Sequence, residues 1–261
     1  MLKTLMKYDI KKMTKLLVYL YPITIGLAVI TRLINLGNNI QVVAIIGSVF
    51  ASLTYTLIVN ILVNTIISII MTFINNFYKD HSYLTHTLPV KKEKLLLSMY
   101  LSALVVIFIS VFVGFLALFI VLYSKTFALG LTELLKQSVI GLNISVGGFV
   151  TLFAFIIFTQ ICSIMSAGFA SIVIGNRYNK KRGLKGFCWF LLFYFGAMIS
   201  TLFVAIIASA ISGDISNLFA ETLAGSTFIS ILVVALVVNA VYAIIMYFIC
   251  LWQFKKGVNV D

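Results

Sequence analysis

The chain has 261 residues, of which 62% are hydrophobic and only 10% are charged, and its mean hydropathy is +1.15. A soluble domain is usually about 45–50% apolar and about 25% charged, so this chain has too few polar residues to cover its apolar surface in water. We therefore expect an all-α integral membrane protein. The formal net charge of +12 does not indicate nucleic-acid binding, because the basic residues form short clusters between apolar runs and no nucleic-acid-binding motif accompanies them.

Residues 1–15 predict an amphipathic helix. Its apolar side recurs at helical spacing and consists of Leu2, Leu5, Met6, Asp9/Ile10, Met13 and Leu17, with lysines on the remaining face. Such a helix lies at the inner membrane surface with its lysines near anionic headgroups. A frayed basic tail is the alternative, and a pattern that lasts four turns disfavours it. The apolar run that follows has no small-x-small cleavage site, so we interpret it as a retained membrane helix and not as a signal peptide.

Six apolar segments are long enough to cross a bilayer, which takes about 20 residues. They cover 16–34, 40–77, 95–123, 144–174, 187–211 and 226–252, and we treat 1–261 as a single transmembrane domain. The second segment contains no Pro and no Gly-Gly pair, although a break in it is not excluded by the sequence. As one helix it would reach about 57 Å, well beyond a hydrocarbon core of about 30 Å, and would protrude into water.

The distribution of Lys and Arg predicts which side each end faces. Of the 19 such residues, all but three lie before the first segment, in 78–94, in 175–186 and in the C-terminal tail. The three exceptions are Arg32, Lys125 and Lys136. The positive-inside rule places both termini in the cytoplasm. An even number of spans requires the same arrangement, so we expect a multi-pass protein of the cell (plasma) membrane.

Chemistry-bearing motifs are missing from the sequence. No GxxxxGK[ST], HExxH, GxSxG or paired-Cys zinc pattern occurs, so we expect no enzymatic activity and no cofactor in this chain. His81 and His86 would lie about 140° apart on a helix without acidic companions, which favours exposed loop histidines over a metal site. Cys162, Cys188 and Cys250 lie in apolar runs and indicate buried thiols.

Polar residues recur at every fourth position of the second segment, from Ser48 to Asn76. Four residues advance 400°, so this stripe drifts about 40° per step and stays on one face for only three or four steps. Its middle part is a candidate for lining a translocation pathway or a subunit interface and comprises Thr56, Asn60, Asn64 and Ser68. The alternative is hydrogen bonding and packing between helices.

The fourth segment carries a second set of polar and small residues. Gln160 is a large amide at membrane depth that needs partners from another helix, so it joins the pathway or interface candidates. A small-xxx-small ridge that predicts close helix packing is formed by Ser163, Ala167, Ser171 and Gly175. The segment interiors contain no Asp, Glu, Lys or His, which disfavours an ion-coupled carrier.

The stretch YKDHSYLTHTLPVKKEKLLLS, residues 78–98, separates the second and third segments. Asp80 is placed to cap a short helix over 81–87. Pro89 disfavours the α region for Leu88 and suits the first turn of the next helix. An exposed knob of Tyr83, Leu84 and Leu88 rimmed by lysine is typical of a protein-docking element, whereas a plain solvated turn is the alternative.

This stretch resembles the signature that follows the second span of ABC-2 type permeases, the membrane subunits of ATP-driven exporters. The family pattern is approximately D-E-G-Y-L-T-x-T-L-P-V, and the chain keeps Tyr83-Leu84-Thr85 and Thr87-Leu88-Pro89-Val90. It departs from the pattern at His81, Ser82 and His86. The six spans, the cytoplasmic termini and the N-terminal amphipathic helix extend the resemblance over nearly the whole chain.

The resemblance implies an ABC-2, type V exporter-like arrangement. Two permease subunits, identical or related, would pair in the membrane, and each would dock on a separate ATP-binding subunit that binds ATP and Mg. The implied docking residues are Asp80, Tyr83, Leu84, Thr85, Thr87, Leu88, Pro89 and Lys91.

We therefore expect the permease subunit of an ABC exporter. A neutral lining of small polar and aromatic residues favours an amphipathic or antimicrobial peptide, a lipid-like molecule or a drug over a strongly charged substrate. The alternatives are a membrane interaction or assembly protein without transport, and an ion-coupled carrier. A neighbouring reading frame for a P-loop ATPase would favour the exporter.

Overall fold

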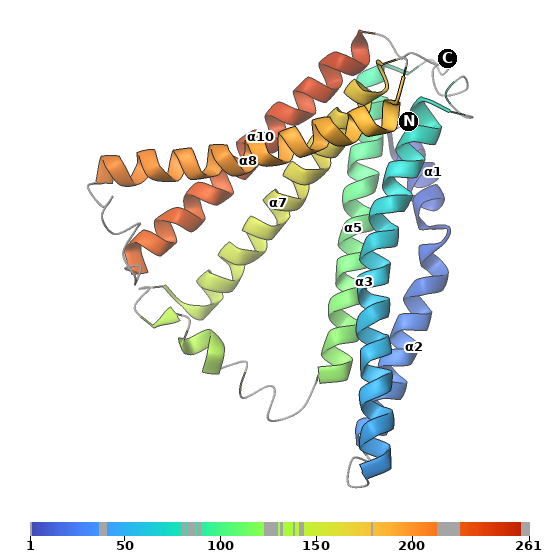
Figure 1. Cartoon of the computed structure of the whole chain (residues 1–261), viewed down its shortest axis with the longest axis vertical. Helices are drawn as coiled ribbons and strands as arrows, with labels where there is room; N and C mark the ends of the chain where they lie inside the picture. The colour runs from blue at the N-terminus through green and yellow to red at the C-terminus, as the bar shows by residue number, and fades with distance from the viewer. Residues whose placement is uncertain are drawn as a thin grey trace. The chain divides into compact units, whose positions relative to one another are not determined.

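The computed structural model describes residues 2–36, 41–79, 82, 87, 90–122, 130, 133–137, 139–140, 144–178, 180–212 and 225–256 (Figure 1). The regular structure of these residues is helical. The labelled helices are α1 (Leu2–Thr14), α2 (Leu17–Asn35), α3 (Gln41–Phe77), α5 (Lys92–Leu122), α7 (Val146–Gly175), α8 (Arg182–Ser212) and α10 (Gly225–Lys255). The chain divides into two compact units, unit 1 (Met1–Leu129) and unit 2 (Gly130–Asp261).

Six of the helices, α2, α3, α5, α7, α8 and α10, are long and apolar enough to cross a membrane. This confirms the prediction of a multi-pass helical membrane protein, while the side that each terminus faces stays a prediction. The largest shifts in boundaries are at the starts of α5 and α8, which begin at Lys92 and Arg182 rather than at 95 and 187, and at the end of α10, which is Lys255 rather than 252. Apolar patterns miss these turns because basic residues continue a helix beyond the hydrocarbon core with their charges in water.

Helix α3 is one continuous helix of 37 residues. At about 1.5 Å per residue it is about 55 Å long. The sequence left open whether 40–77 is one helix or a broken one, and the structure shows one continuous helix that is longer than a hydrocarbon core of about 30 Å.

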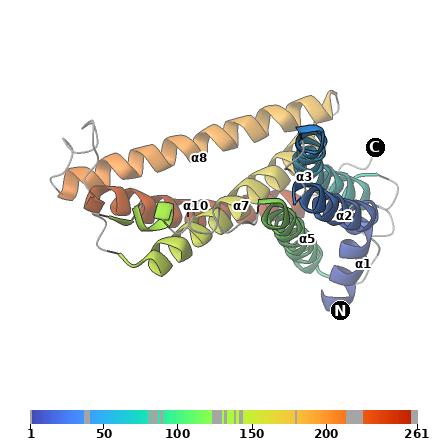
Figure 2. The same ribbon diagram turned by 90° about the horizontal axis from the view of Figure 1, so that it is seen from below.

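In unit 1, helices α2, α3 and α5 run side by side (Figures 1 and 2). An apolar core holds them together and includes Ala28, Ile58, Ala117 and Val121. Buried hydroxyls add hydrogen bonds between the helices: Thr31 to Thr54 at 2.9 Å, and Ser110 to both Tyr21 and Thr65 at 2.7 Å. Small polar groups that bond across helices are a common source of association in lipid, where apolar contacts alone discriminate poorly.

In unit 2, α7 and α10 run in the same direction, and Arg177 just after α7 donates a hydrogen bond to Gln253 near the end of α10. Helix α8 turns back from α7 (Figure 1). A Cβ atom built on Gly175 would lie 2.5 Å from the Cα of Gly186, so the two helices meet at glycine backbones. Farther along, the Tyr242 hydroxyl donates to the Phe193 carbonyl at 2.6 Å and ties α10 to α8.

The small-residue ridge of α7 is buried, which confirms its predicted packing role. Its members Ser163, Ala167 and Ser171 are 1%, 3% and 2% exposed. The cysteines are free thiols, but only Cys250 is buried, whereas Cys162 is half-buried and Cys188 exposed. The prediction of a buried thiol is wrong for Cys188 because this residue lies on an outward face of α8.

Candidate functional site

The predicted docking segment lies largely outside the described residues. Of its members, Thr87 and Lys91 are described and both are exposed. Those outside are Asp80, Tyr83, Leu84, Thr85, Leu88 and Pro89, and His81 and His86 also fall there. The predicted short helix over 81–87 is described only at Ser82 and Thr87, which are both helical.

The start of α5 corrects one prediction for this segment. The Lys91 carbonyl accepts hydrogen bonds from the N–H groups of Lys94 at 2.9 Å and Leu95 at 3.3 Å, so Lys91 is the residue that precedes the helix. Val90 and Lys91 are not helical. Pro89 therefore comes before α5 and not in its first turn. Glu93 does lie in that first turn, as predicted, where a carboxylate is favoured by the helix dipole.

The segment leaves α3 from a buried aromatic base. Phe73 and Phe77 pack edge-to-face with ring centroids 5.0 Å apart, and Phe73 lies 6.5 Å from the ring of Tyr78. After Lys79 the next described residue is Ser82, which is 4% exposed and whose N–H donates to the Lys79 carbonyl at 2.7 Å. The chain is thus fixed by packing at the point where it exits α3.

A polar cluster joins α1 to both helices that flank the segment. Asn76, in the last turn of α3, donates to the Asp9 carboxylate at 3.1 Å and accepts from the Lys12 ammonium at 2.7 Å. Ser98, in the second turn of α5, donates to the other Asp9 oxygen at 2.9 Å. We call these four residues, Asp9, Lys12, Asn76 and Ser98, the α1 clamp.

The electrostatics of the α1 clamp explain its composition. Burial raises the pKa of the Asp9 carboxyl above its ordinary value, and the hydrogen bond from Ser98, the charge of Lys12 and the hydrogen bond from Asn76 partly offset that rise. A partly buried carboxylate is tolerated where donors and an opposite charge face it. The clamp therefore depends on all three partners, which come from three different helices.

The clamp also shows which way α1 faces. Met13 is fully buried, and the side of α1 that holds Asp9 packs against α5 and α3, while Lys3, Lys7 and Lys11 are exposed. The amphipathic pattern predicted for 1–15 is thus present, and its apolar face contacts protein. Its position at the membrane surface stays a prediction.

The polar stripe on α3 rotates from the outside of unit 1 to its inside, as the predicted drift requires. Thr56 and Asn60 are exposed, Asn64 and Ser68 are half-buried, and Thr72 is 5% exposed. The Asn64 amide donates to the Asn60 carbonyl at 2.9 Å and to the Asn60 side chain, and the Thr56 hydroxyl donates to Ser52 at 2.9 Å. Each of these three hydrogen bonds stays within α3 and does not join it to another helix of unit 1.

In unit 2, Gln160 is half-buried on α7, and its amide makes no hydrogen bond to another described residue. Asn239 on α10 is only 6% exposed and likewise has no hydrogen-bond partner among the described residues. Asn239 was not among the predicted site residues, although an amide in the middle of an apolar run is itself a signal of a polar contact. Gln160 stays a candidate for contacts with a further subunit or a substrate.

Sequence reasoning also missed the α1 clamp, and the signal for it was Asp9, a single acid on the apolar side of a lysine-rich helix. Among the described residues, no group of three or more His, Cys, Asp and Glu could hold a metal ion. The α1 clamp links the ends of three helices mechanically.

No protein-family model, curated protein or solved structure matches this chain. The resemblance to ABC-2 permeases therefore rests on the sequence motif and on the order of the spans.

Proposed function

We propose that the protein is the permease subunit of an ABC exporter. The observation that carries the proposal is the α1 clamp, which binds α1 to the last turn of α3 and the second turn of α5. These are the helix ends on either side of the 78–91 stretch that holds the Tyr-Leu-Thr-x-Thr-Leu-Pro motif. A push on that stretch would reach three helices at once.

The mechanism follows from the stiffness of α3. An ATP-binding partner, which holds ATP and Mg, would dock on 78–94 and move it as the ATPase pair closes. Because α3 is continuous over 37 residues, a displacement at its end near Asn76 would tilt the whole helix and carry the exposed stripe with it. Large coupled movements of rigid elements are the usual form of such transitions.

The side-chain amides of Asn60 and Asn64 on α3 fit a pathway or a contact between two permease subunits. An amide that faces lipid cannot exchange its hydrogen bonds with water, which is costly. The hydrogen bonds from Asn64 to Asn60 reduce that cost. Contact of these amides with protein or water would remove the remaining cost. The neutral lining favours an amphipathic peptide, a lipid-like molecule or a drug as substrate.

Affinity capture of the tagged full chain from its native membranes in mild detergent tests the proposal. We expect a polypeptide with a P-loop to copurify. Replacing Leu84 and Leu88 together by Asp should reduce its recovery at least tenfold, because buried apolar anchors dominate the affinity of protein interfaces.

The matched control is the double variant Leu134→Asp, Ile140→Asp, which adds the same charges at two exposed aliphatic residues in the connection before α7. It should retain the partner. Equal loss in both double variants, or capture without any P-loop protein, would contradict the proposal.

A further inference from the structure

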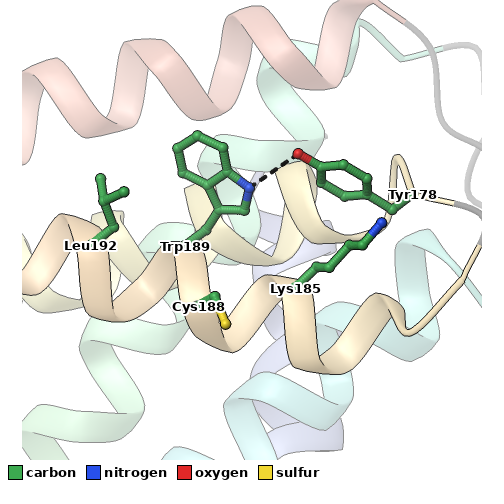
Figure 3. A pocket seen from close by; sticks show the side chains of 5 residues that line it. All are labelled: Tyr178, Lys185, Cys188, Trp189 and Leu192. Atoms are coloured by element: carbon green, nitrogen blue, oxygen red, sulfur yellow. Dashed lines mark hydrogen bonds between the residues drawn. The ribbon is translucent and has the colours of Figure 1, made fainter.

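A hollow of about 230 Å³ lies on unit 2 where the chain turns from α7 into α8. Tyr178 from the turn and Lys185, Cys188, Trp189 and Leu192 from the first three turns of α8 line it (Figure 3). We call it the Tyr178 hollow. Lys181 in the turn has a φ of 55°, a left-handed conformation that reverses the chain before α8 begins.

The polar groups of the hollow form an ordered set of donors. The Trp189 indole N–H donates to the Tyr178 hydroxyl at 3.4 Å, so the hydroxyl oxygen serves as an acceptor and its own proton remains available to donate outward. The Lys185 ammonium lies 4.0 Å from the centre of the Tyr178 ring. Figure 3 shows the ammonium near the backbone end of the Tyr178 ring and the hydroxyl at the opposite end, turned toward Trp189. A cation and a free hydroxyl proton together match the oxygens of an anion.

Charge around the hollow is one-sided. Arg177, Lys180, Lys181 and Arg182 flank it in sequence, and the chain contains no Asp or Glu between Glu133 and Asp214. No acidic side chain of α7 or α8 can therefore neutralise these cations. An anionic ligand at the hollow would therefore meet positive charge without competition from an acidic side chain of these two helices.

The rest of the hollow is apolar and continues along a candidate membrane span. Helix α8 spans a membrane by length and composition from Arg182 to Ala210. Leu192 in the hollow is 58% exposed, and further exposed apolar side chains on the same helix are Leu184, Phe187 and Phe195. Tyr, Trp and Lys at one end of a span typically lie at the depth of the lipid headgroups.

We propose that the Tyr178 hollow binds the phosphate headgroup of an anionic phospholipid, with the acyl chains along Leu192. Lys185 and the Tyr178 hydroxyl would contact the phosphate oxygens, and Trp189 would hold the Tyr178 hydroxyl in place. Basic and aromatic hollows between membrane helices are a recognised basis for binding such headgroups. The proposal does not depend on export.

Cys188 supplies the reporter, because its exposed thiol lines the hollow. The purified full chain in neutral detergent micelles is treated with N-ethylmaleimide, and modification of Cys188 is followed by peptide mass spectrometry. Added dioleoyl phosphatidylglycerol should slow the reaction saturably, whereas dioleoyl phosphatidylcholine at the same mole fraction should not. Lys185→Gln should raise the phosphatidylglycerol needed for half-protection about fivefold, the effect of one basic residue near an anionic lipid.

Two variants and one soluble anion complete the test. Lys185→Arg keeps the charge and should retain protection. Lys256→Gln removes the matched lysine that lies 3.1 Å from the Trp252 ring at the end of α10 and should change half-protection less than about twofold. Equal protection by the two lipids, equal effects of Lys185→Gln and Lys256→Gln, or equal protection by glycerol 3-phosphate would overturn the proposal.

Discussion

Replacing Asn76 by Ala should release α1 from the bundle of unit 1. The side chain makes two hydrogen bonds to α1, one to the Asp9 carboxylate at 3.1 Å and one from the Lys12 ammonium at 2.7 Å. Hydrogen bonds that involve a charged group contribute about 1.5–3 kcal/mol each. Because Asn76 is only half-buried, water can replace part of both, and we expect a loss of about 2 kcal/mol in total.

A loss of about 2 kcal/mol raises the opening equilibrium of α1 about 30-fold. Amide hydrogen exchange of the full chain in mild detergent reads this equilibrium directly when reclosing is fast. The backbone amides of residues 6–14 should therefore exchange about 30-fold faster in Asn76→Ala than in the unmodified chain at the same pH and temperature.

The matched control is Asn64→Ala. It removes the same side chain from the same helix, but the Asn64 amide bonds to Asn60 and not to α1. Exchange of α1 should stay within about twofold of the unmodified chain. If both variants accelerate exchange equally, or if neither does, the α1 clamp is not what holds α1.

Two further predictions concern pH and packing. Burial raises the pKa of the Asp9 carboxyl, so the folded state binds this proton more tightly than the unfolded state, and stability should fall as pH rises from the ordinary Asp pKa through the raised one. When the melting temperature in detergent is plotted against pH, Asp9→Asn should remove the decline in this pH range. An unchanged slope would refute the claim that Asp9 causes the decline. Gly175→Ala should lower the melting temperature by the equivalent of about 1–3 kcal/mol, because the new Cβ would lie 2.5 Å from the Gly186 backbone. Gly168→Ala, on the same helix with nothing within 4 Å of its Cβ, should have little effect.

The helices of this protein could be predicted from sequence because each span is a long, predominantly apolar run. The first-turn residues of α5 and α8 were missed since they are basic and solvated, as at Lys92 and Arg182. The buried ridge of α7 was predictable from spacing alone, because Ser163, Ala167 and Ser171 recur every four residues and small side chains allow close approach.

The α1 clamp could not be predicted in full, because the periodicity of a helix shows which of its faces is buried but not which other helix packs against that face. Asp9 stood out on α1, but Ser98 lies 89 residues away in the chain, and nothing local links the two. The Tyr178 hollow depends on the turn at Lys181, which has a left-handed φ. A lysine in the sequence does not indicate this conformation. The clamp thus arises from tertiary contacts, and the hollow from the backbone geometry of one turn.

Because the polar stripe drifts around α3, it lies on an exposed face at Asn60 and on the face that contacts α1 at Asn76. From Asn60 to Asn76 the stripe advances four steps of about 40°, or about 160° around the helix, which takes it from an exposed face to the face that meets α1. The two asparagines are sixteen residues apart, about 24 Å along the axis. Since no Pro interrupts this stretch, a tilt imposed at Asn76 displaces Asn60 in the same motion. A stripe that stayed on one face could serve the clamp or the exposed surface but not both, so the 40° drift is what allows a single helix to link them.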